Sequence, residues 1–148
     1  MKGLVIKPML VEDLEYIYEI ERLSFSIPWP MEAFVRELTS NRLAHYLTVR
    51  DKDRVAAYGG MWLILDEAHI TNLAVHPAYR RKGIGRMLLK GMIEYGISNG
   101  IRSFTLEVRE SNHTAIKLYE SAGFIKAGIR KGYYSDTNEN AIIMWLEL

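Results

Sequence analysis

Apolar residues recur along the chain at two spacings, one typical of helices and the other typical of strands. Spacings of three and four residues predict four amphipathic helices, at residues 11–23, 31–38, 83–97 and 112–121. Alternating or β-rich runs predict about seven strands, at residues 4–9, 43–50, 55–65, 68–75, 102–108, 124–129 and 141–147. Helices and strands mixed in this order predict an α/β (α+β) fold.

Three of these strands follow one another within residues 43–75, separated only by short polar turns at residues 51–53 and 66–67. Connections this short predict an antiparallel meander. The middle strand contains Gly59-Gly60. Paired glycines inside a strand predict a bulge or a close approach by another part of the chain.

The stretch from Ile70 to Leu89 carries the most informative pattern. A strand ends at His76-Pro77, since proline cannot donate to a sheet ladder, and helical spacing begins near Gly83. Between them lie basic residues and two glycines, where backbone N–H groups can approach a ligand beside the unpaired donors of a helix N-terminus. Such a terminus favours anions, so the segment predicts a phosphate site. A glycine pair alone is more often a plain strand-to-helix turn.

Composition narrows the class of protein. With 148 residues, 49% hydrophobic and 25% charged, the chain suits a single domain spanning residues 1–148. Nineteen basic against eighteen acidic side chains leave a net charge of +1, which argues against broad electrostatic capture of nucleic acid or of a membrane. We expect a monomer or a weak dimer.

The chain contains no cysteine, which excludes disulfides, thiolate metal sites and a cysteine-bound acyl group. The four histidines lack metal-ligand spacing, so no metal is expected. The N-terminus lacks the pattern of a signal peptide, and the longest apolar run, residues 55–65, is shorter than a membrane span. We therefore expect a cytoplasmic protein.

The string Arg-x-x-Gly-x-Gly, at residues 80–85 after a strand ending Leu-Ala-Val, resembles the acetyl-CoA signature of the GCN5-related N-acetyltransferases (GNAT). A nucleotide P-loop or a Rossmann fingerprint would need residues that are absent here. The resemblance implies the GNAT fold, with a single mixed, mostly antiparallel, splayed sheet, and acetyl-CoA as cosubstrate. It implies coenzyme contacts from Leu73, Ala74, Val75, Arg80, Arg81, Lys82, Gly83, Ile84, Gly85, Arg86, Asn112 and Tyr119.

Acetyl transfer to an amine needs a proton acceptor, a proton donor and a group that binds the oxyanion. Glu107 alone is more typical of an outward-facing strand residue paired with Arg109 or Arg102. Its surroundings, Leu-Glu-Val-Arg-Glu-Ser-Asn, resemble the RimI branch of the family, which implies that Glu107 is the general base and Tyr119 the general acid. Tyr119 is otherwise a core aromatic. The oxyanion is expected to meet a β-strand N–H freed by a splay of the sheet.

Segments near both ends of the chain also resemble the RimI branch, and they imply the acceptor site. The expected acceptor residues are Glu21, Phe25, Trp29, His69, Tyr133 and Tyr134, with His69 as an auxiliary base. Packing alone is the alternative role for the aromatics. The branch acetylates the N-terminal alanine of a small-subunit ribosomal protein. Two positions depart from its pattern, Gly132 in place of asparagine and His69 in place of threonine.

Two other functions stay open at this level. One is acetylation of a small-molecule amine such as a polyamine or an antibiotic, although aromatic residues, rather than a carboxylate cluster, mark the expected acceptor side. The other is a non-catalytic acyl-CoA-binding subunit, which would need neither Glu107 nor Tyr119.

Overall fold

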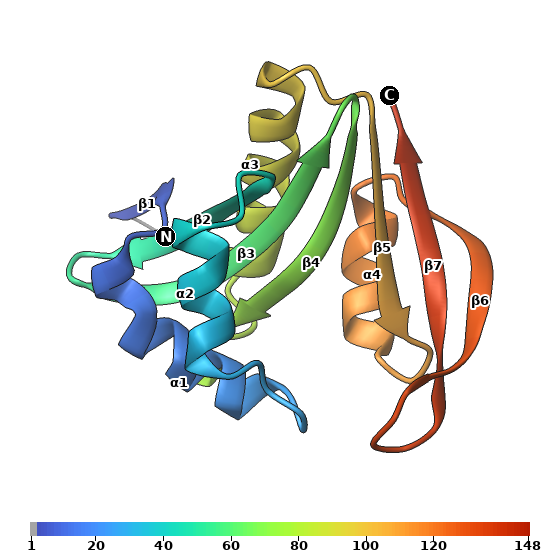
Figure 1. Ribbon diagram of the computed structural model, residues 1–148, viewed down its shortest axis with the longest axis horizontal. Helices are drawn as coiled ribbons and strands as arrows, with labels where there is room; N and C mark the ends of the chain where they lie inside the picture. Colours follow the sequence, from blue (N-terminus) through green and yellow to red (C-terminus); the bar gives the residue numbers. More distant parts are fainter. Residues whose placement is uncertain (1–2) are drawn as a thin grey trace.

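A computed structural model describes residues 3–148, and a seven-stranded sheet runs through this part of the chain. The strands are β1 (Leu4–Pro8), β2 (Ala44–Asp51), β3 (Arg54–Ile64), β4 (Glu67–Val75), β5 (Ser103–Arg109), β6 (Ile125–Tyr134) and β7 (Glu139–Glu147). They lie in the order β1-β2-β3-β4-β5-β7-β6 (Figure 1). Only β4 and β5 pair in parallel, which confirms the mostly antiparallel sheet and the β2–β3–β4 meander.

Helices cover both faces of the sheet. They are α1 (Leu14–Ser24), α2 (Met31–Thr39), α3 (Ile84–Ser98) and α4 (His113–Ser121), with single 3-10 turns η1 (Val11–Asp13) and η2 (Pro77–Tyr79). Helices α1 and α2 bury Ile17, Ile20 and Phe34 against one face, whereas the cores under α3 and α4 include Leu88 and Tyr119 on the other. Burial of apolar surface at about 25 cal/mol per Å² holds each layer in place.

Several element boundaries differ from those predicted by one or more residues, including the following three. The first helix begins as a 3-10 turn, because the buried Asp13 accepts a hydrogen bond from the Leu10 N–H (2.8 Å) and pairs with Arg50. The turn between β3 and β4 falls at residues 65–66, one residue earlier than predicted. Strand β6 continues to Tyr134, five residues beyond its predicted end, because its later residues pair with β7 up to Tyr134–Glu139.

Gly59-Gly60 has both features that paired glycines predict. The β3–β4 register shifts after Gly60, where Thr71 is the extra residue on β4. A Cβ atom on Gly59 would lie 2.5 Å from the Met92 sulfur of α3, and one on Gly60 would lie 2.2 Å from the Tyr46 ring. The glycines therefore let α3 approach one face of the sheet while Tyr46 packs across the other.

The sheet splits between its two parallel strands. β4 and β5 pair only at Glu67–Ser103, Ala68–Phe104 and His69–Thr105, and beyond these pairs the strands separate (Figure 1). The edge of β4 from Ile70 to Val75 therefore has no strand partner on the β5 side. Its backbone donors are available to a ligand, as the splay expected from the sequence requires.

Candidate active site

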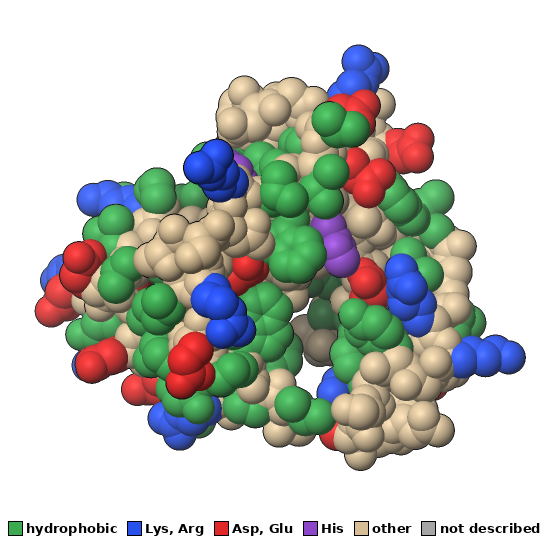
Figure 2. Space-filling view, in the orientation of Figure 1, with side chains coloured by type: hydrophobic (Ala, Val, Ile, Leu, Met, Phe, Trp, Pro, Cys, Tyr) green, Lys and Arg blue, Asp and Glu red, His purple; other side chains and the backbone are tan. Residues whose placement is uncertain are grey.

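A cleft of about 760 Å³ opens where β4 and β5 separate. Figure 2 shows the surface hollowed between the part carrying α1 and α2 and the part carrying β5 to β7. Side chains from both parts line the cleft. Those predicted from the sequence are Glu21, Phe25, Trp29, His69, Leu73, Glu107, Asn112, Tyr119, Tyr133 and Tyr134. The structure thus brings together residues separated by more than 110 positions in the chain.

Glu107 lies at the head of the split, two residues beyond the last β4–β5 pair, His69–Thr105. Side chains alternate along a strand, so Thr105, Glu107 and Arg109 share one face of β5 while Leu106 and Val108 face the α3 and α4 core. The Glu107 side chain is 11% exposed. The alternation therefore directs this carboxylate into the cleft on the face that also carries α1 and α2.

His69 contacts this carboxylate directly. Its Nε2 lies 2.8 Å from Glu107 Oε2, and Arg130 Nε lies 3.8 Å from Glu107 Oε1. The hydrogen bond from His69, and secondarily the charge of Arg130, hold the pKa of Glu107 below its usual range, although burial acts in the opposite direction. Glu107 is consequently ionised at neutral pH. Neither Arg109 nor Arg102 is its partner, in contrast to the simpler role considered from the sequence.

Tyr119 reaches the cleft from α4, on the opposite face of the sheet from α1 and α2. Its ring packs against Phe124, with centroids 5.6 Å apart, and the residue is 7% exposed. Burial raises the pKa of the Tyr119 hydroxyl well above its ordinary value, so the group keeps its proton. Within residues 3–148 this hydroxyl has no hydrogen-bond partner, and it is not sealed from solvent. It is therefore free to bond a ligand in the cleft.

The predicted phosphate cradle is the turn from Arg80 to Gly83 and the first turn of α3. Arg81 (φ +63°) and Gly83 (φ +77°) adopt left-handed backbone conformations, which bend the chain sharply before the helix. The first intrahelical hydrogen bond runs from the Met87 N–H to the Gly83 carbonyl, so the N–H groups of residues 84–86 point out of the helix unpaired. No side chain caps this terminus, and its first turn carries no acid.

The cradle fits a diphosphate. Three basic side chains near this terminus, those of Arg81, Lys82 and Arg86, are exposed to solvent. They take part in none of the ion pairs formed among residues 3–148. A Cβ on Gly85 would make only ordinary contacts with Leu118 (3.5 Å) and Val75 (3.6 Å). Packing within the protein therefore does not require glycine at this position.

The other residues predicted to contact the coenzyme differ in which of their groups are available to a ligand. The Arg80 guanidinium hydrogen-bonds to the Val75 carbonyl (3.2 Å) and to the Ser24 hydroxyl (3.4 Å), so it braces the turn. The side chains of Ile84 and Ala74 are buried, which leaves only their backbone for a ligand. Asn112 caps α4 by accepting a hydrogen bond from the Ala115 N–H (3.1 Å), and its amide nitrogen remains available to the cleft.

Among the residues predicted to bind the acceptor, Glu21 is hydrogen-bonded within the protein. Its carboxylate accepts hydrogen bonds from the Trp29 N–H (2.8 Å) and from the Tyr58 hydroxyl. Burial raises the pKa of Glu21, an effect that these two bonds partly offset. Glu21 thereby fixes the connection between α1 and α2. Phe25, in this connection, is 37% exposed and offers an apolar surface to the cleft.

The opposite wall is formed by the end of β6. Tyr133 and Tyr134 pack edge to face, with centroids 5.1 Å apart. Arg109 lies 4.1 Å above the Tyr134 ring, and burial raises the pKa of Tyr134 to about 12. Gly132 (φ +59°) precedes them, and a Cβ there would lie 2.8 Å from Asn138 Oδ1. The departure from the family pattern at Gly132 thus coincides with a left-handed, crowded position.

Several cleft residues lay outside the predicted site, among them Trp62, Arg109, Ser26 and Asp136. Trp62 packs edge to face on His69 (6.2 Å) and donates a hydrogen bond to Glu37 (2.8 Å). Arg109 shares the face of β5 with Glu107, a signal that strand alternation alone could have given. Ser26 and Asp136 contact each other across the cleft, and no local pattern predicts a contact between residues 110 positions apart.

Two negative findings apply to residues 3–148. No helix in this part is long and apolar enough to cross a membrane. Nor do three or more histidine or acidic side chains gather there in an arrangement that would hold a metal ion.

Comparison with known proteins agrees with the acetyltransferase family that the sequence motif suggests. Residues 14–124 match the model of the acetyltransferase (GNAT) family. The [ribosomal protein bS18]-alanine N-acetyltransferase of Escherichia coli (strain K12) is 40% identical over 145 residues, covering 97% of each chain. A crystal structure of the E. coli ribosomal-protein-S18-alanine N-acetyltransferase superposes with a TM-score of 0.89 at 37% identity, covering 97% of this chain and 93% of the other. The NatC complex bound to Gag peptide and CoA shares the fold, with a TM-score of 0.84 at 22% identity over 99% of each chain.

Proposed function

The chain belongs to the acetyltransferase (GNAT) family, and on that premise we propose that it transfers the acetyl group of acetyl-CoA to the N-terminal alanine of ribosomal protein bS18. The E. coli relative named for this reaction is 40% identical to the chain over nearly the whole of both proteins. Because acetyl-CoA and ribosomal proteins are both found in the cytoplasm, we propose that the protein acts there. The observation that carries the proposal is the position of Glu107, held 2.8 Å from His69 where the parallel strands separate.

We assign Glu107 as the proton acceptor. An α-ammonium group has a reference pKa near ~8, so a large part of the acceptor is protonated at neutral pH and must lose a proton before attack. Glu107 is ionised and faces the side of the cleft where α1 and α2 lie. His69, bonded to the same carboxylate, is placed to orient it and to share the proton. A carboxylate acting directly or through one water is adequate for this transfer.

We assign Tyr119 as the proton donor on the other side of the split. Acetyl-CoA supplies an acetyl group activated as a thioester, and its departing thiolate needs a proton. The Tyr119 hydroxyl keeps its proton at neutral pH and is free of protein partners within residues 3–148. Backbone donors of β4 without a strand partner, at Leu73 to Val75, would bind the carbonyl oxygen. The first turn of α3, with Arg81, Lys82 and Arg86, would hold the diphosphate.

The walls of the cleft favour a peptide over a polyamine. Phe25, Trp29 and Tyr133 are aromatic, which suits the backbone and small side chains of an extended peptide. The acidic side chains there are already engaged, Glu107 by His69 and Asp136 by Arg109, so they do not form an open anionic surface for a polycation. The presence of both Glu107 and Tyr119 in one cleft supports an enzyme rather than a binding subunit.

A panel of peptides tests this function. Purified protein and acetyl-CoA are incubated with peptides that differ at their free first residue, and with an N-blocked peptide carrying an internal lysine. Mass spectrometry then locates the added acetyl group. We expect acetylation of the α-amine of the alanine peptide, several-fold to many-fold faster than of peptides with bulky first residues. Exclusive acetylation of the blocked lysine peptide, or of free polyamines, would reject the proposal.

A further inference from the structure

Trp62 and His69 lie directly opposite each other on neighbouring strands. They are paired in the antiparallel register of β3 and β4, so their side chains project from the same face of the sheet, the one that carries α2. Their rings pack edge to face, with centroids 6.2 Å apart and planes at 87°. On the other side of Trp62, β2 places Ala44, whose small side chain leaves room for the indole. Trp62 is therefore the aromatic neighbour of His69 across the β3–β4 ladder.

Glu37, on α2, fixes the indole of Trp62. Its Oε1 accepts hydrogen bonds from Trp62 Nε1 (2.8 Å) and from the Tyr46 hydroxyl (2.9 Å), and its Oε2 accepts one from Asn41 Nδ2 (2.7 Å). The residue is 8% exposed and takes part in none of the ion pairs formed among residues 3–148. Three donors from different segments hold this buried carboxylate in one position. Because Glu37 does not line the cleft, it acts on the cleft only through neighbours such as Trp62.

His69 is the side chain that needs this support. Its Nε2 lies 2.8 Å from Glu107 Oε2, and its side chain is 33% exposed. In the part of the chain that the structure describes, its Nδ1 makes no hydrogen bond to protein. The χ2 torsion of histidine is broad, so one hydrogen bond leaves the ring free to turn. The Trp62 ring packs against His69 and limits that rotation.

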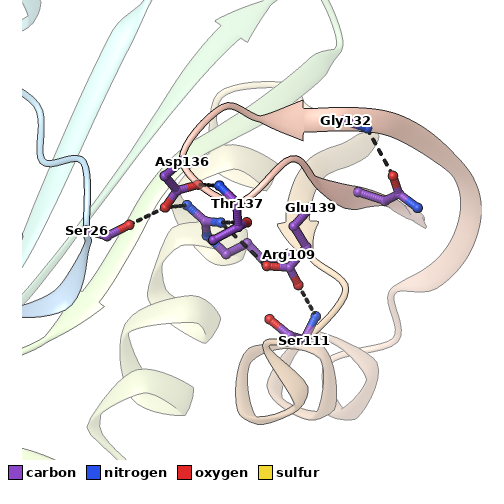
Figure 3. Close-up of polar contacts among 8 residues, drawn as sticks. Ser26, Arg109, Ser111, Gly132, Asp136, Thr137 and Glu139 are labelled. Carbon is purple, nitrogen blue, oxygen red and sulfur yellow. Dashed lines mark hydrogen bonds and ion pairs between the residues drawn. The ribbon is translucent and has the colours of Figure 1, made fainter.

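The other groups that face Glu107 leave His69 as its nearest hydrogen-bond partner. Arg130 Nε, from β6, lies 3.8 Å from Glu107 Oε1, and its side chain is more than half exposed. Tyr134, also on β6, is the other titratable group close enough to sense this carboxylate. Arg109, the next residue on the same face of β5, is hydrogen-bonded to the β6–β7 turn instead (Figure 3). The orientation of His69 therefore decides how firmly the carboxylate is held.

We propose that Trp62, held by Glu37, is a positioning residue that keeps the His69 ring in hydrogen-bonding contact with Glu107. The path runs from α2 through β3 and β4 to the head of the split in the sheet, and each step is a contact between side chains. In this role Trp62 and Glu37 act through His69. This inference rests on the proposed function, because the geometry of Glu107 affects turnover only where Glu107 accepts a proton from the acceptor.

Two substitutions loosen His69 without changing it. Trp62→Phe removes the indole N–H that bonds to Glu37 and leaves a smaller ring beside His69. Glu37→Met removes the hydrogen-bond acceptor at similar size, whereas Glu37→Gln keeps an oxygen for the Trp62 N–H and is the conservative rescue. Trp145→Phe is the matched control, because Trp145 is a half-buried tryptophan on β7 that does not line the cleft. Thermal unfolding of each variant measures any purely structural loss.

NMR titration of the Glu107 carboxyl in the free protein is the first readout. The hydrogen bond from His69 is the largest cause of the lowered pKa of Glu107, so a loosened His69 should raise that pKa. We expect the rise in Trp62→Phe and in Glu37→Met. Glu37→Gln and Trp145→Phe should titrate like the wild type.

The pH–rate profile of kcat/KM for an N-terminal-alanine peptide is the second readout. The ionised carboxylate is the active form of the base, so a raised pKa leaves less of it at low pH. In Trp62→Phe the acidic limb should therefore move to higher pH. On that limb kcat/KM should fall by roughly two- to tenfold, the factor that corresponds to the free energy of an edge-to-face aromatic pair.

A double-mutant cycle separates positioning from a structural role. In the His69→Ala background, Trp62→Phe should cause no further rise in the pKa of Glu107, because the ring through which Trp62 acts is gone. An equal rise with and without His69 would overturn the proposal, as would an unchanged Glu107 pKa in the folded Trp62→Phe variant. Inactivity of the wild type on every N-terminal peptide, together with the expected coupling in the titration, would reject the proposed function and support the positioning of Glu107.

Discussion

The proposed coenzyme side and the proposed acceptor side of this cleft are built in different ways. The coenzyme side consists of one continuous stretch, the end of β4, the turn at residues 80–83 and the first turn of α3, and it offers mainly backbone N–H groups. The acceptor side combines the α1–α2 connection with the β6–β7 turn, joined by the side chains of Ser26 and Asp136. Glu107 lies between the two, at the head of the split.

This difference determines how sensitive each side of the cleft is to amino-acid substitutions. Backbone donors at a helix terminus survive most side-chain substitutions, whereas a surface assembled from distant segments depends on a few side-chain contacts. A coenzyme could therefore be bound largely through backbone groups of one short segment, whereas the acceptor surface depends on side chains such as Ser26, Arg109 and Asp136. The substitutions below test whether the two sides are separable, beginning with the group that serves both.

Glu107→Gln should have the largest effect, because it removes the proton acceptor while keeping the size of the side chain. We expect kcat to fall by about 100-fold or more, within the range of 10² to 10⁴ typical of general acid–base groups. The loss should be greatest on amines that are still protonated at the assay pH. A pH–rate profile of kcat/KM checks this, with coenzyme binding measured separately by calorimetry. An unchanged pH–rate profile would contradict the role of Glu107 as the general base.

Tyr119→Phe should come next, with kcat lowered by about 100-fold, at the lower end of that range, and KM for the acceptor nearly unchanged. The hydroxyl has no partner within residues 3–148, so the variant should unfold at about the wild-type temperature. Steady-state kinetics and thermal unfolding measure the two effects. Wild-type turnover would contradict the role of Tyr119 as the acid, and a large loss of stability would indicate a structural role instead.

Gly85→Ala should act on the coenzyme side alone. The added methyl group makes only ordinary contacts within the protein, and alanine favours helix over glycine, so stability should rise by up to about 1 kcal/mol. Close approach of a diphosphate should be hindered, so we expect KM for acetyl-CoA to rise about tenfold with acceptor selectivity unchanged. Gly128→Ala, in β6, is the matched control. An unchanged KM would show that the cradle does not need this glycine.

His69→Ala should have the smallest effect on turnover at neutral pH, less than tenfold. The hydrogen bond from His69 is the largest cause of the lowered pKa of Glu107, so its loss should raise that pKa, since burial persists and Arg130 alone opposes it. A carboxyl group whose pKa is lower in the folded protein than in the unfolded chain stabilises the folded state at pH values above the unfolded pKa. That stability is lost as the pH falls through the folded pKa. NMR titration of the Glu107 carboxyl, in wild type and variant, measures the shift. A downward shift would contradict this assignment.

Much of the fold and of the coenzyme side could be predicted from the sequence, because both are encoded locally. Periodicity predicted the helices, the Gly59-Gly60 pair predicted the bulge, and the residues around Gly83 predicted the uncapped helix terminus that we propose binds the diphosphate. The acceptor side was predicted only in part. Phe25 and Trp29 follow from their own segment, but the Ser26–Asp136 contact depends on tertiary packing between segments 110 residues apart.

Side-chain partners were the least predictable feature. Glu107 could have paired with Arg109 or Arg102, yet strand alternation and the hairpin direct Arg109 to Asp136 and Glu139, and leave His69 and Arg130 beside Glu107. Which of several nearby charges forms a pair depends on small differences in their positions in the folded protein. The spacing of residues in the sequence does not determine such differences.

The most direct test of this account uses the whole acceptor protein. Purified bS18 and acetyl-CoA are incubated with the wild-type enzyme or with Glu107→Gln, and intact and peptide mass spectrometry follow the rate and the position of acetylation. The account predicts one acetyl group, on the N-terminal alanine, transferred about 100-fold more slowly by the variant. Acetylation of a lysine, or equal rates for the two enzymes, would contradict it.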